Sequence, residues 1–268
     1  MVPGEQILAP APNAAQPVEA VDIVGVPISA IHMTQAIDRI AGWIGKPQSQ
    51  YVCVADVHSV MVARANPLHM ASMRGAAMVT PDGTPLVWVG RLLGRSISRV
   101  CGPDLLPAVC AVSEAGGWRH YFYGGASGVV DQLSAALTAK YPKLQIAGTH
   151  TPPFRTLSAD EDAAIMQEIA AAKPDIVWVG LGCPKQERWM ADHVARLPGV
   201  TLIGIGAAFD FHTNRVERAP LWMQRNGLEW LFRLLSEPRR LWRRYLVLAP
   251  QFVWLAAKQV LRSVSHPS

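Results

Sequence analysis

Two short segments of the chain carry side chains that could perform acid–base or phosphate chemistry. The first is Thr80-Pro81-Asp82-Gly83, where a carboxylate follows a short apolar run. If that run is a strand, Asp82 stands at its carboxyl end and can take a proton from a substrate hydroxyl. Asp-Gly is also a common turn pair, and the spacing alone favours a cap on a helix that begins near Pro85. Catalysis and capping both stay open for Asp82.

The second segment is Gly182-Cys183-Pro184-Lys185-Gln186-Glu187, which places three polar side chains where a helix is predicted to begin. Proline is favoured at the first position of a helix, so Lys185, Gln186 and Glu187 fall in its first turn. A glutamate there stabilises the positive end of the helix dipole, and Glu187 needs no other role. A lysine there opposes the dipole, so Lys185 indicates that an anion binds nearby.

A glycine-rich segment, Gly124-Gly125-Ala126-Ser127-Gly128, lies between a predicted strand and a predicted helix. Small residues at such a point let backbone N–H groups approach a diphosphate at the helix N-terminus. The spacing differs from the G-x-G-x-x-G of dinucleotide-binding proteins, so no dinucleotide site follows. By itself the segment is a weak indication of phosphate binding.

Metal-dependent and hydrolytic chemistry finds little support in the sequence. Asp160-Glu161-Asp162 matches the D-x-D pattern of metal-dependent sugar transferases, but Ser158 and Glu161 form a capping box that explains these acids better. The four cysteines form no C-x-x-C pair and no histidine stands at zinc-ligand spacing, which indicates a reducing compartment and argues against a structural metal. Neither H-E-x-x-H nor G-x-S-x-G is present. We therefore expect no metal and no other cofactor.

Short apolar runs alternate with amphipathic stretches, a pattern that predicts a mostly parallel sheet wrapped by helices. Ligands bind in such doubly wound sheets where the carboxyl ends of strands meet helix N-termini, which is where the three segments above fall. The predicted strands are Val21–Val26, Tyr51–Ala55, Met78–Thr80, His120–Tyr123, Leu144–Gly148, Ile176–Gly180 and Leu202–Ile205. The predicted helices are Met33–Ile44, His58–Met73, Pro85–Leu93, Asp104–Ala115, Gly128–Tyr141, Ala159–Ala172 and Lys185–Arg196. The sequence thus predicts a Rossmann-like α/β catalytic domain over residues 21–214.

The C-terminal segment, residues 215–268, differs from the rest of the chain in charge. It holds ten basic residues against three glutamates, a net charge of +7, whereas the remainder of the chain carries −2. Four tryptophans lie among its arginines: Trp222, Trp230, Trp242 and Trp254. We predict a basic amphipathic helical appendage, broken at Pro238 and Pro250, of the composition that binds an anionic membrane surface.

Other interpretations of this appendage stay open. Its tryptophans could pack on the body while its arginines are merely solvated, and a homo-oligomer could cover it until it meets a membrane. A nucleic-acid-binding tail would display stacking aromatics in a polar segment, whereas these tryptophans lie among Leu and Val, which favours lipid over nucleic acid. At the other end, residues 1–20 are Pro/Ala-rich without signal-peptide character and are predicted to be a disordered leader. No apolar run is long enough to cross a membrane, so we expect a cytoplasmic protein.

Taken in order, these segments resemble the WecG/TagA/CpsF family of bacterial glycosyltransferases over roughly residues 20–262. Any one motif is common, whereas the whole set in this order is specific. The motifs are Pro81-Asp82-Gly83, Val100-Cys101-Gly102-Pro103-Asp104-Leu105, Gly124-Gly125, Gly182-Cys183-Pro184-Lys185-Gln186-Glu187-Arg188-Trp189, Gly206-Ala207-Ala208-Phe209-Asp210, Arg218-Ala219-Pro220, Gly227-Leu228-Glu229-Trp230-Leu231 and Glu237-Pro238-Arg239-Arg240.

The resemblance implies a metal-independent, inverting transfer of a hexose or N-acetylhexosamine from a UDP-sugar to a sugar on a polyprenyl-diphosphate carrier. It places the enzyme on the inner face of the cell membrane, in exopolysaccharide or cell-surface polysaccharide synthesis. By position, Asp82 resembles the base that deprotonates the acceptor, and Gln186 a catalytic residue that contacts the sugar or diphosphate. Nucleotide or sugar contacts are implied for Gly124, Gly125, Lys185, Glu187 and Asp210. Lipid-diphosphate contacts are implied for Arg233, Arg240 and Arg243.

One segment departs from the family pattern. Where members often carry Thr-Pro-Asn, this chain has Val54-Ala55-Asp56, so a hydroxyl is missing at Val54 and a carboxylate replaces an amide at Asp56. The identity of the transferred sugar is therefore left open by the resemblance. A nucleotide-sugar-binding scaffold without turnover is a further alternative, which release of UDP would exclude.

Overall fold

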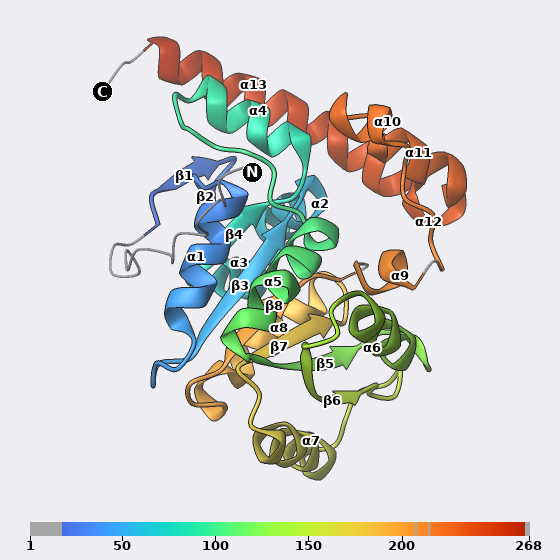
Figure 1. Ribbon diagram of the computed structural model, residues 1–268. Coiled ribbons are helices and arrows are strands. Elements are labelled where there is room, and N and C mark those ends of the chain that lie inside the picture. The colour runs from blue at the N-terminus through green and yellow to red at the C-terminus, as the bar shows by residue number, and fades with distance from the viewer. Residues whose placement is uncertain (1–17, 207, 214, 266–268) are drawn as a thin grey trace, which may run out of the picture.

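A six-stranded parallel sheet forms the middle of the structure (Figure 1). The computed structural model describes residues 18–206, 208–213 and 215–265. The strand order is β4-β3-β8-β7-β5-β6, and each neighbouring pair runs parallel. The strands are β3 (Gln50–Ala55), β4 (Met78–Pro81), β5 (Arg119–Gly124), β6 (Gln145–His150), β7 (Ile176–Gly180) and β8 (Thr201–Gly204). The predicted doubly wound α/β fold is confirmed.

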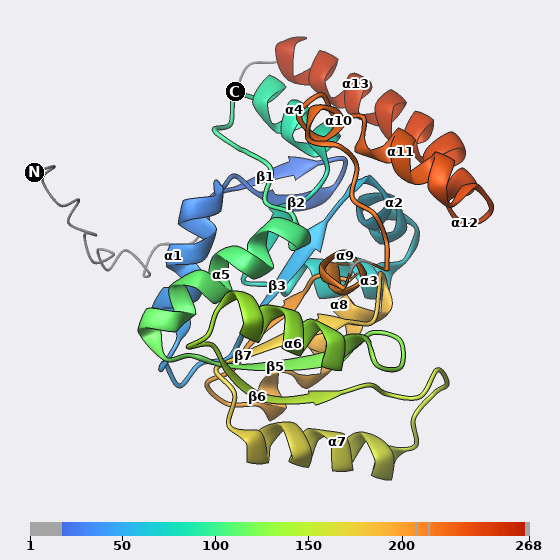
Figure 2. The same cartoon turned by 45° about the vertical axis from the view of Figure 1, so that its right-hand side comes forward.

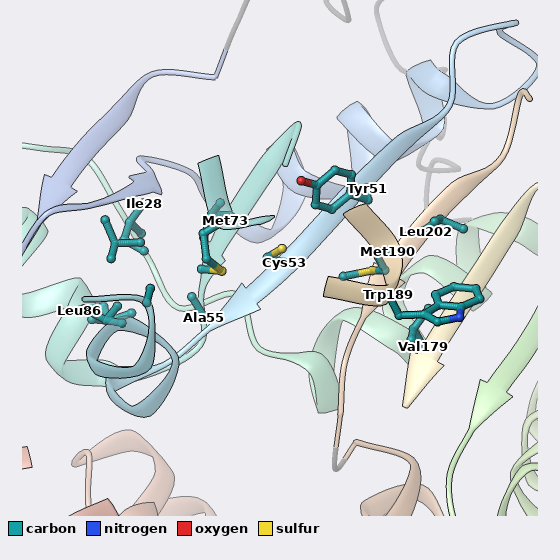
Figure 3. Close-up of a cluster of buried hydrophobic side chains, with 14 of the residues drawn as sticks. Ile28, Tyr51, Cys53, Ala55, Met73, Leu86, Val179, Trp189, Met190 and Leu202 are labelled. Carbon is teal, nitrogen blue, oxygen red and sulfur yellow. The ribbon is translucent and has the colours of Figure 1, made fainter. Parts of the chain in front are cut away.

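Helices cover both faces of this sheet because successive side chains of each buried strand point to opposite faces. Trp178 of β7 joins a core that includes α1, α5, α6 and α9, whereas the next residue, Val179, joins a core that includes α2, α3, α4, α7 and α8. Part of the second core is shown in Figure 3. The helices are α1 (Met33–Trp43), α2 (Val57–Ala65), α3 (Pro67–Arg74), α4 (Thr84–Leu92), α5 (Gly102–Gly116), α6 (Val129–Lys140), α7 (Ala159–Ala172), α8 (Lys185–His193) and α9 (Ala208–His212).

The first predicted strand, Val21–Val26, is wrong in extent. The structure has an antiparallel hairpin instead, β1 (Ala20–Ile23) and β2 (Val26–Ser29), which forms a sheet of its own. The turn between the two strands is Val24-Gly25, with φ of 55° and 91°. A β-branched residue in the left-handed region is uncommon, so the sequence lacked the usual hairpin signal. Of the predicted leader, residues 1–17 lie outside the described residues, and Ala20 lies in β1.

The predicted helix His58–Met73 is two helices, α2 and α3, separated at Asn66. Pro67 is the first residue of α3, and a proline disfavours helical backbone at the residue before it. The Asn66 side chain accepts the backbone N–H groups of Leu68 and His69, so it caps the second helix. The break turns α3 toward α8, which it contacts.

The C-terminal appendage is helical, as predicted, and one of its two predicted breaks is present. Pro238 begins α12, which confirms the first break. The break at Pro250 is wrong, since the helical backbone continues from the π-helix η2 into the first turn of α13, where Pro250 is the second residue. A proline within a continuous helix lacks the N–H that would bond one turn back, and the wider π turn before Pro250 leaves room for its ring. The elements are α10 (Leu221–Arg225), α11 (Glu229–Ser236), α12 (Pro238–Trp242), η2 (Arg243–Leu248) and α13 (Ala249–Ser265).

The appendage lies against the body through α13, which runs beside α4 in both views (Figures 1 and 2). Phe252 and Ala256 of α13 are buried in the core that contains α2 and α4. The Gln259 side chain accepts the backbone N–H of Val24 at 2.8 Å and donates to the Asp22 carbonyl at 2.7 Å. The four tryptophans of the appendage nevertheless stay exposed, so they do not supply this attachment. Within residues 18–206, 208–213 and 215–265, no helix is both long and apolar enough to cross a membrane.

Candidate active site

Asp82 follows β4 directly, at the carboxyl end of the parallel sheet. Its backbone N–H donates to the carbonyl of Ala55 at 2.8 Å, and its own carbonyl accepts the Arg99 Nε–H at 2.7 Å. Helix α4 has Gly83 as its N-cap and no side-chain cap, so the capping role considered for Asp82 is excluded. The carboxylate is therefore held at the sheet edge without a structural task in the helix.

Burial and the neighbouring charges together set the pKa of Asp82. Nη2 of Arg99 lies 3.7 Å from the Asp82 carboxylate and 2.6 Å from the carboxylate of Glu229. Burial raises the pKa of Asp82 from its ordinary 3.8 to about 6; Arg99 opposes this shift and Glu229 adds to it. A carboxyl group that is ionised at neutral pH but has a raised pKa accepts a proton more readily than an ordinary one, which suits a general base.

A chain of charges connects Asp82 to the appendage. Glu229 belongs to α11, and beyond its contact with Arg99 it lies 3.9 Å from Arg218. Arg218 in turn donates to Asp104 of α5 at 2.5 Å. Arg99 has no predicted role, and Asp104, Arg218 and Glu229 belong to the family-like motifs without a predicted role of their own. The signal that could have found the latter three is their charge inside motifs that otherwise consist mostly of small and apolar residues.

Gly124 and Gly125 join the carboxyl ends of β5 and β7 by a close backbone approach. The N–H of Gly125 donates to the Gly180 carbonyl at 2.9 Å, and both glycines have positive φ, 115° and 72°. A Cβ on Gly124 would lie 2.7 Å from the backbone of Gly180. The following helix, α6, has Gly128 as its N-cap and no side-chain cap, so its first backbone N–H groups face this turn without a capping side chain. The arrangement suits a phosphate group.

Gly124→Ala is expected to destabilise the protein by about 2–4 kcal/mol, because a clash with backbone adds to the cost of the left-handed conformation. Gly94 is the matched control, since it has φ of 77° and nothing within 4 Å of an added Cβ. Gly94→Ala is expected to cost about 1 kcal/mol. The measurement is the urea midpoint of each variant, and equal midpoints for the two variants would contradict the close approach.

The three polar residues of the first turn of α8 have different surroundings. Gln186 is 4% exposed; its Oε1 accepts the Gly182 N–H at 3.2 Å and its Nε2 donates to Glu187 at 3.0 Å. Gln186 therefore holds the loop before α8 in place, and one amide hydrogen is left for a ligand. Lys185 is exposed, with its ammonium 5.0 Å from the ring centre of Phe154. The structure therefore groups Gln186 with Glu187, and it does not bring Lys185 to them.

A buried cluster beside Gln186 is absent from the sequence predictions. Nε2 of His69 lies 3.7 Å from Sγ of Cys183, and the ligand atoms of His69, Cys183 and Glu187 all lie within 4.8 Å of one another. These are side chains that bind Zn²⁺ in proteins, so the set could hold a metal ion. Local spacing could not reveal this set, because 114 residues separate His69 from Cys183. Burial raises the pKa of Glu187 and of Cys183, so the cluster can also persist as neutral hydrogen-bonding groups.

Asp210 lies in α9, whose Phe209 packs on the glycine turn of β5 and β7. A Cβ on Gly125 would lie 3.4 Å from the Phe209 ring, so Asp210 is placed next to the candidate phosphate site. Burial raises the pKa of Asp210, and the charges of Arg215, Arg240 and Arg233 lower it.

The three arginines predicted to bind a lipid diphosphate do not all face the site. The charge of Arg233 acts on both Asp82 and Asp210, and that of Arg240 acts on Asp210. Arg243 lies with its guanidinium 5.5 Å from the ring centre of the exposed Trp242. The charges of Arg233 and Arg240 therefore act on Asp210, although both arginines pair with Glu237, whereas Arg243 is exposed on the surface of α12 and η2.

Asp56, which departs from the family pattern, pairs with a residue of the appendage. One carboxylate oxygen of Asp56 accepts the Ser59 N–H at 2.9 Å and caps α2, and the other pairs with Arg244 of η2. An asparagine would cap the helix equally well but would carry no charge to pair with Arg244. Asp56 therefore provides a further attachment of the appendage to the body, beside the candidate site.

Comparison with known proteins identifies the family. Residues 21–266 match the model of the glycosyl transferase WecG/TagA/CpsF family. A relative from Bacillus spizizenii is 30% identical over 81% of this chain and 82% of its own length. Another from Bacillus subtilis is 31% identical over 68% of each chain. One from Staphylococcus aureus (strain MW2) is 25% identical over 89% of this chain and 92% of its own.

All three relatives are named N-acetylglucosaminyldiphosphoundecaprenol N-acetyl-beta-D-mannosaminyltransferase. The family match spans nearly all of the chain, including the sheet, the loop of Asp82 and the appendage. The chain belongs to the WecG/TagA/CpsF family of glycosyl transferases, and it is a glycosyltransferase.

Proposed function

We propose that this enzyme transfers a hexose or N-acetylhexosamine from a UDP-sugar to a sugar on a polyprenyl diphosphate, with inversion and without a metal. The observation that carries the proposal is the carboxylate of Asp82. It caps no helix, is partly buried, has a raised pKa and lies at the sheet edge beside an arginine-bearing appendage. The names of the relatives support an acceptor of this class. Exopolysaccharide or another cell-surface polysaccharide is the proposed product.

In the proposed reaction Asp82 takes the proton of the acceptor hydroxyl as the oxygen attacks the anomeric carbon of the donor. The bond from that carbon to the UDP oxygen breaks on the opposite face, so the configuration inverts and UDP leaves as an anion. A single base is sufficient for this displacement. Arg99 keeps the carboxylate ionised and oriented, because it contacts both the side chain and the carbonyl of Asp82.

Protein groups are proposed to stabilise the leaving diphosphate. The N-terminus of α6 and the turn at Gly124-Gly125 supply backbone N–H groups, and Arg233 and Arg240 supply positive charge on the side of Asp210. Oriented donors of this kind typically contribute about 10²–10³-fold each to the rate. A metal ion is therefore not required by the proposal.

The proposed location is the inner face of the cell membrane, with exposed apolar side chains of the appendage and of α4 in the interface. Large exposed apolar residues occur on α4, α10 and α13, and α13 lies against α4 (Figure 2). Arg218 and Arg244 pair with carboxylates of the body, so they are not displayed as a phosphate-binding stripe. This favours lipid over nucleic acid as the anionic partner.

A screen for UDP release tests the proposal. Candidate donors, UDP-N-acetylmannosamine, UDP-N-acetylglucosamine and UDP-glucose, are mixed with a short-chain prenyl-diphosphate N-acetylglucosamine. We expect one donor to release UDP in an acceptor-dependent way, at a rate unchanged by excess EDTA. A protein that binds a donor but releases no UDP when the acceptor is present would be a non-catalytic scaffold. Loss of turnover in EDTA would refute the metal-independent mechanism.

A further inference from the structure

A groove between the body and the appendage leads to the neighbourhood of Asp82. Its volume is about 380 Å³. Helix α4 lines it with Val87, Trp88 and Arg91, and α10 lines it with Leu221. Its lining also includes Arg99, whose guanidinium lies 3.7 Å from the Asp82 carboxylate.

The groove is a built feature of the contact between α4 and the turn after α10. Gly227, at φ of 71°, lies so close to α4 that an added Cβ would be 3.3 Å from Thr84 and 3.5 Å from Trp88. Glu229, two residues further on, pairs with Arg99. The appendage therefore forms one wall of the groove and also touches the charge that holds the candidate base.

The lining of the groove combines exposed apolar side chains with positive charge. Trp88 is 53% exposed and Leu221 66% exposed, and their neighbours Leu92 and Trp222 are also exposed and apolar. Arg91 and Arg99 supply positive charge to the lining, where Arg99 pairs with Glu229 and Asp104 pairs with Arg218. In the described part of the chain, no carboxylate lies within ion-pair distance of Arg91.

A ligand that fits this lining has both an anionic head and a long apolar chain. A nucleotide sugar lacks the apolar part, and a neutral lipid lacks the charge. We propose that the groove between α4 and α10 is the portal of the acceptor: its diphosphate binds at Arg91 and Arg99, and its first isoprene units lie between Trp88 and Leu221. This inference rests on the proposed function, and it puts the lipid on the α4 side of the appendage instead of at Arg243.

Photo-crosslinking tests the portal without requiring turnover. The full-length Asp82→Asn protein is incubated with a prenyl-diphosphate N-acetylglucosamine that carries a diazirine in its first isoprene unit. We expect the label in peptides that contain residues 84–92 and 221–225, and we expect undecaprenyl diphosphate to compete. Label confined to α12 and α13, or competition by inorganic pyrophosphate equal to that by the lipid, would overturn the portal.

Kinetics with a matched pair of leucine variants provide the second test. Leu221→Glu places a charge in the lining of the groove, whereas Leu68→Glu changes a leucine of α3 that is 59% exposed and outside the groove. With a long-chain acceptor in detergent micelles, we expect Leu221→Glu to raise KM by roughly tenfold, the effect of losing the apolar contact of about two methylene groups. Leu68→Glu is expected to leave KM within about twofold of wild type, as is usual for a surface change.

The acceptor's chain length separates failure of the portal from failure of the proposed function. With an acceptor of one isoprene unit, the difference in KM between Leu221→Glu and Leu68→Glu is expected to shrink, because less apolar chain lies in the groove. Equal KM values for the two variants on the long chain, in an active enzyme, would overturn the portal alone. A wild-type enzyme that releases UDP with no acceptor would refute the proposed function, while the crosslinking result would still decide whether the groove binds a prenyl diphosphate.

Discussion

Asp82→Asn is expected to reduce sugar transfer by about 10²–10⁴-fold, the usual contribution of a positioned general base. The asparagine keeps the shape of the side chain but cannot accept the proton of the acceptor hydroxyl. Because the candidate site offers Glu229 and Asp210 as further carboxylates, the loss tests whether Asp82 in particular serves as the base.

The same substitution is expected to stabilise the folded protein at neutral pH. Burial raises the pKa of Asp82 from 3.8 to about 6, so keeping it ionised costs folding free energy above pH 6 and costs nothing below pH 3.8. Removing the charge should therefore add stability on the order of 1–2 kcal/mol at pH 7.5, allowing for screening at a side chain that is 30% exposed. The gain should shrink as the pH falls from 6 to 4.

Urea unfolding at pH 7.5 and pH 5, together with UDP-release assays, measures both effects. Asp38→Asn is the control, because Asp38 is an exposed carboxylate on α1 outside the candidate site. An Asp82→Asn protein that is both inactive and less stable at pH 7.5 would indicate a structural role instead. In the wild type, kcat/KM should fall as the pH is lowered through about 6, since protonated Asp82 cannot act as a base.

The fold could be predicted because its strands and helices are indicated by patterns of residues that are neighbours in the sequence. Strands such as β5 and β7 are buried on both faces, so they appear in the sequence as short apolar runs, and the predicted Ile176–Gly180 equals β7. The hairpin was missed because its turn has Val24 in a conformation that valine rarely adopts. A contact with Gln259, 235 residues away from Val24, stabilises that turn and could not be inferred from neighbouring residues.

Some residues of the candidate site could likewise be predicted from the sequence, and others could not. Asp82 could be found because a polar residue at the end of an apolar run marks the carboxyl end of a strand. The role of Arg99 could not, since it depends on Glu229, 130 residues further along the chain. The pairing of Asp56 with Arg244 likewise becomes visible when the appendage folds back on the body, and it explains a residue that departs from the family pattern.

Arg99→Gln is expected to lower kcat/KM by about 100-fold at pH 7.5, the effect of a misplaced reacting group. Arg99 contacts both the carbonyl and the carboxylate of Asp82. The variant therefore no longer orients Asp82, and it lacks the positive charge that lowers the pKa of Asp82. The acid limb of its pH–rate profile should consequently move to higher pH. A structural role alone would lower activity at every pH and leave the limb in place.

Glu229→Gln is expected to move the same limb in the opposite direction. The charge of Glu229 raises the pKa of Asp82, so its removal lowers that pKa and extends activity to lower pH. The double variant should show a limb between those of the single variants, because Arg99 and Glu229 pair at 2.6 Å and their effects are not independent. Limbs that move in the same direction in both single variants would contradict this electrostatic arrangement. Opposite shifts would identify Asp82 as the titrating base and would show that a glutamate of the appendage tunes it.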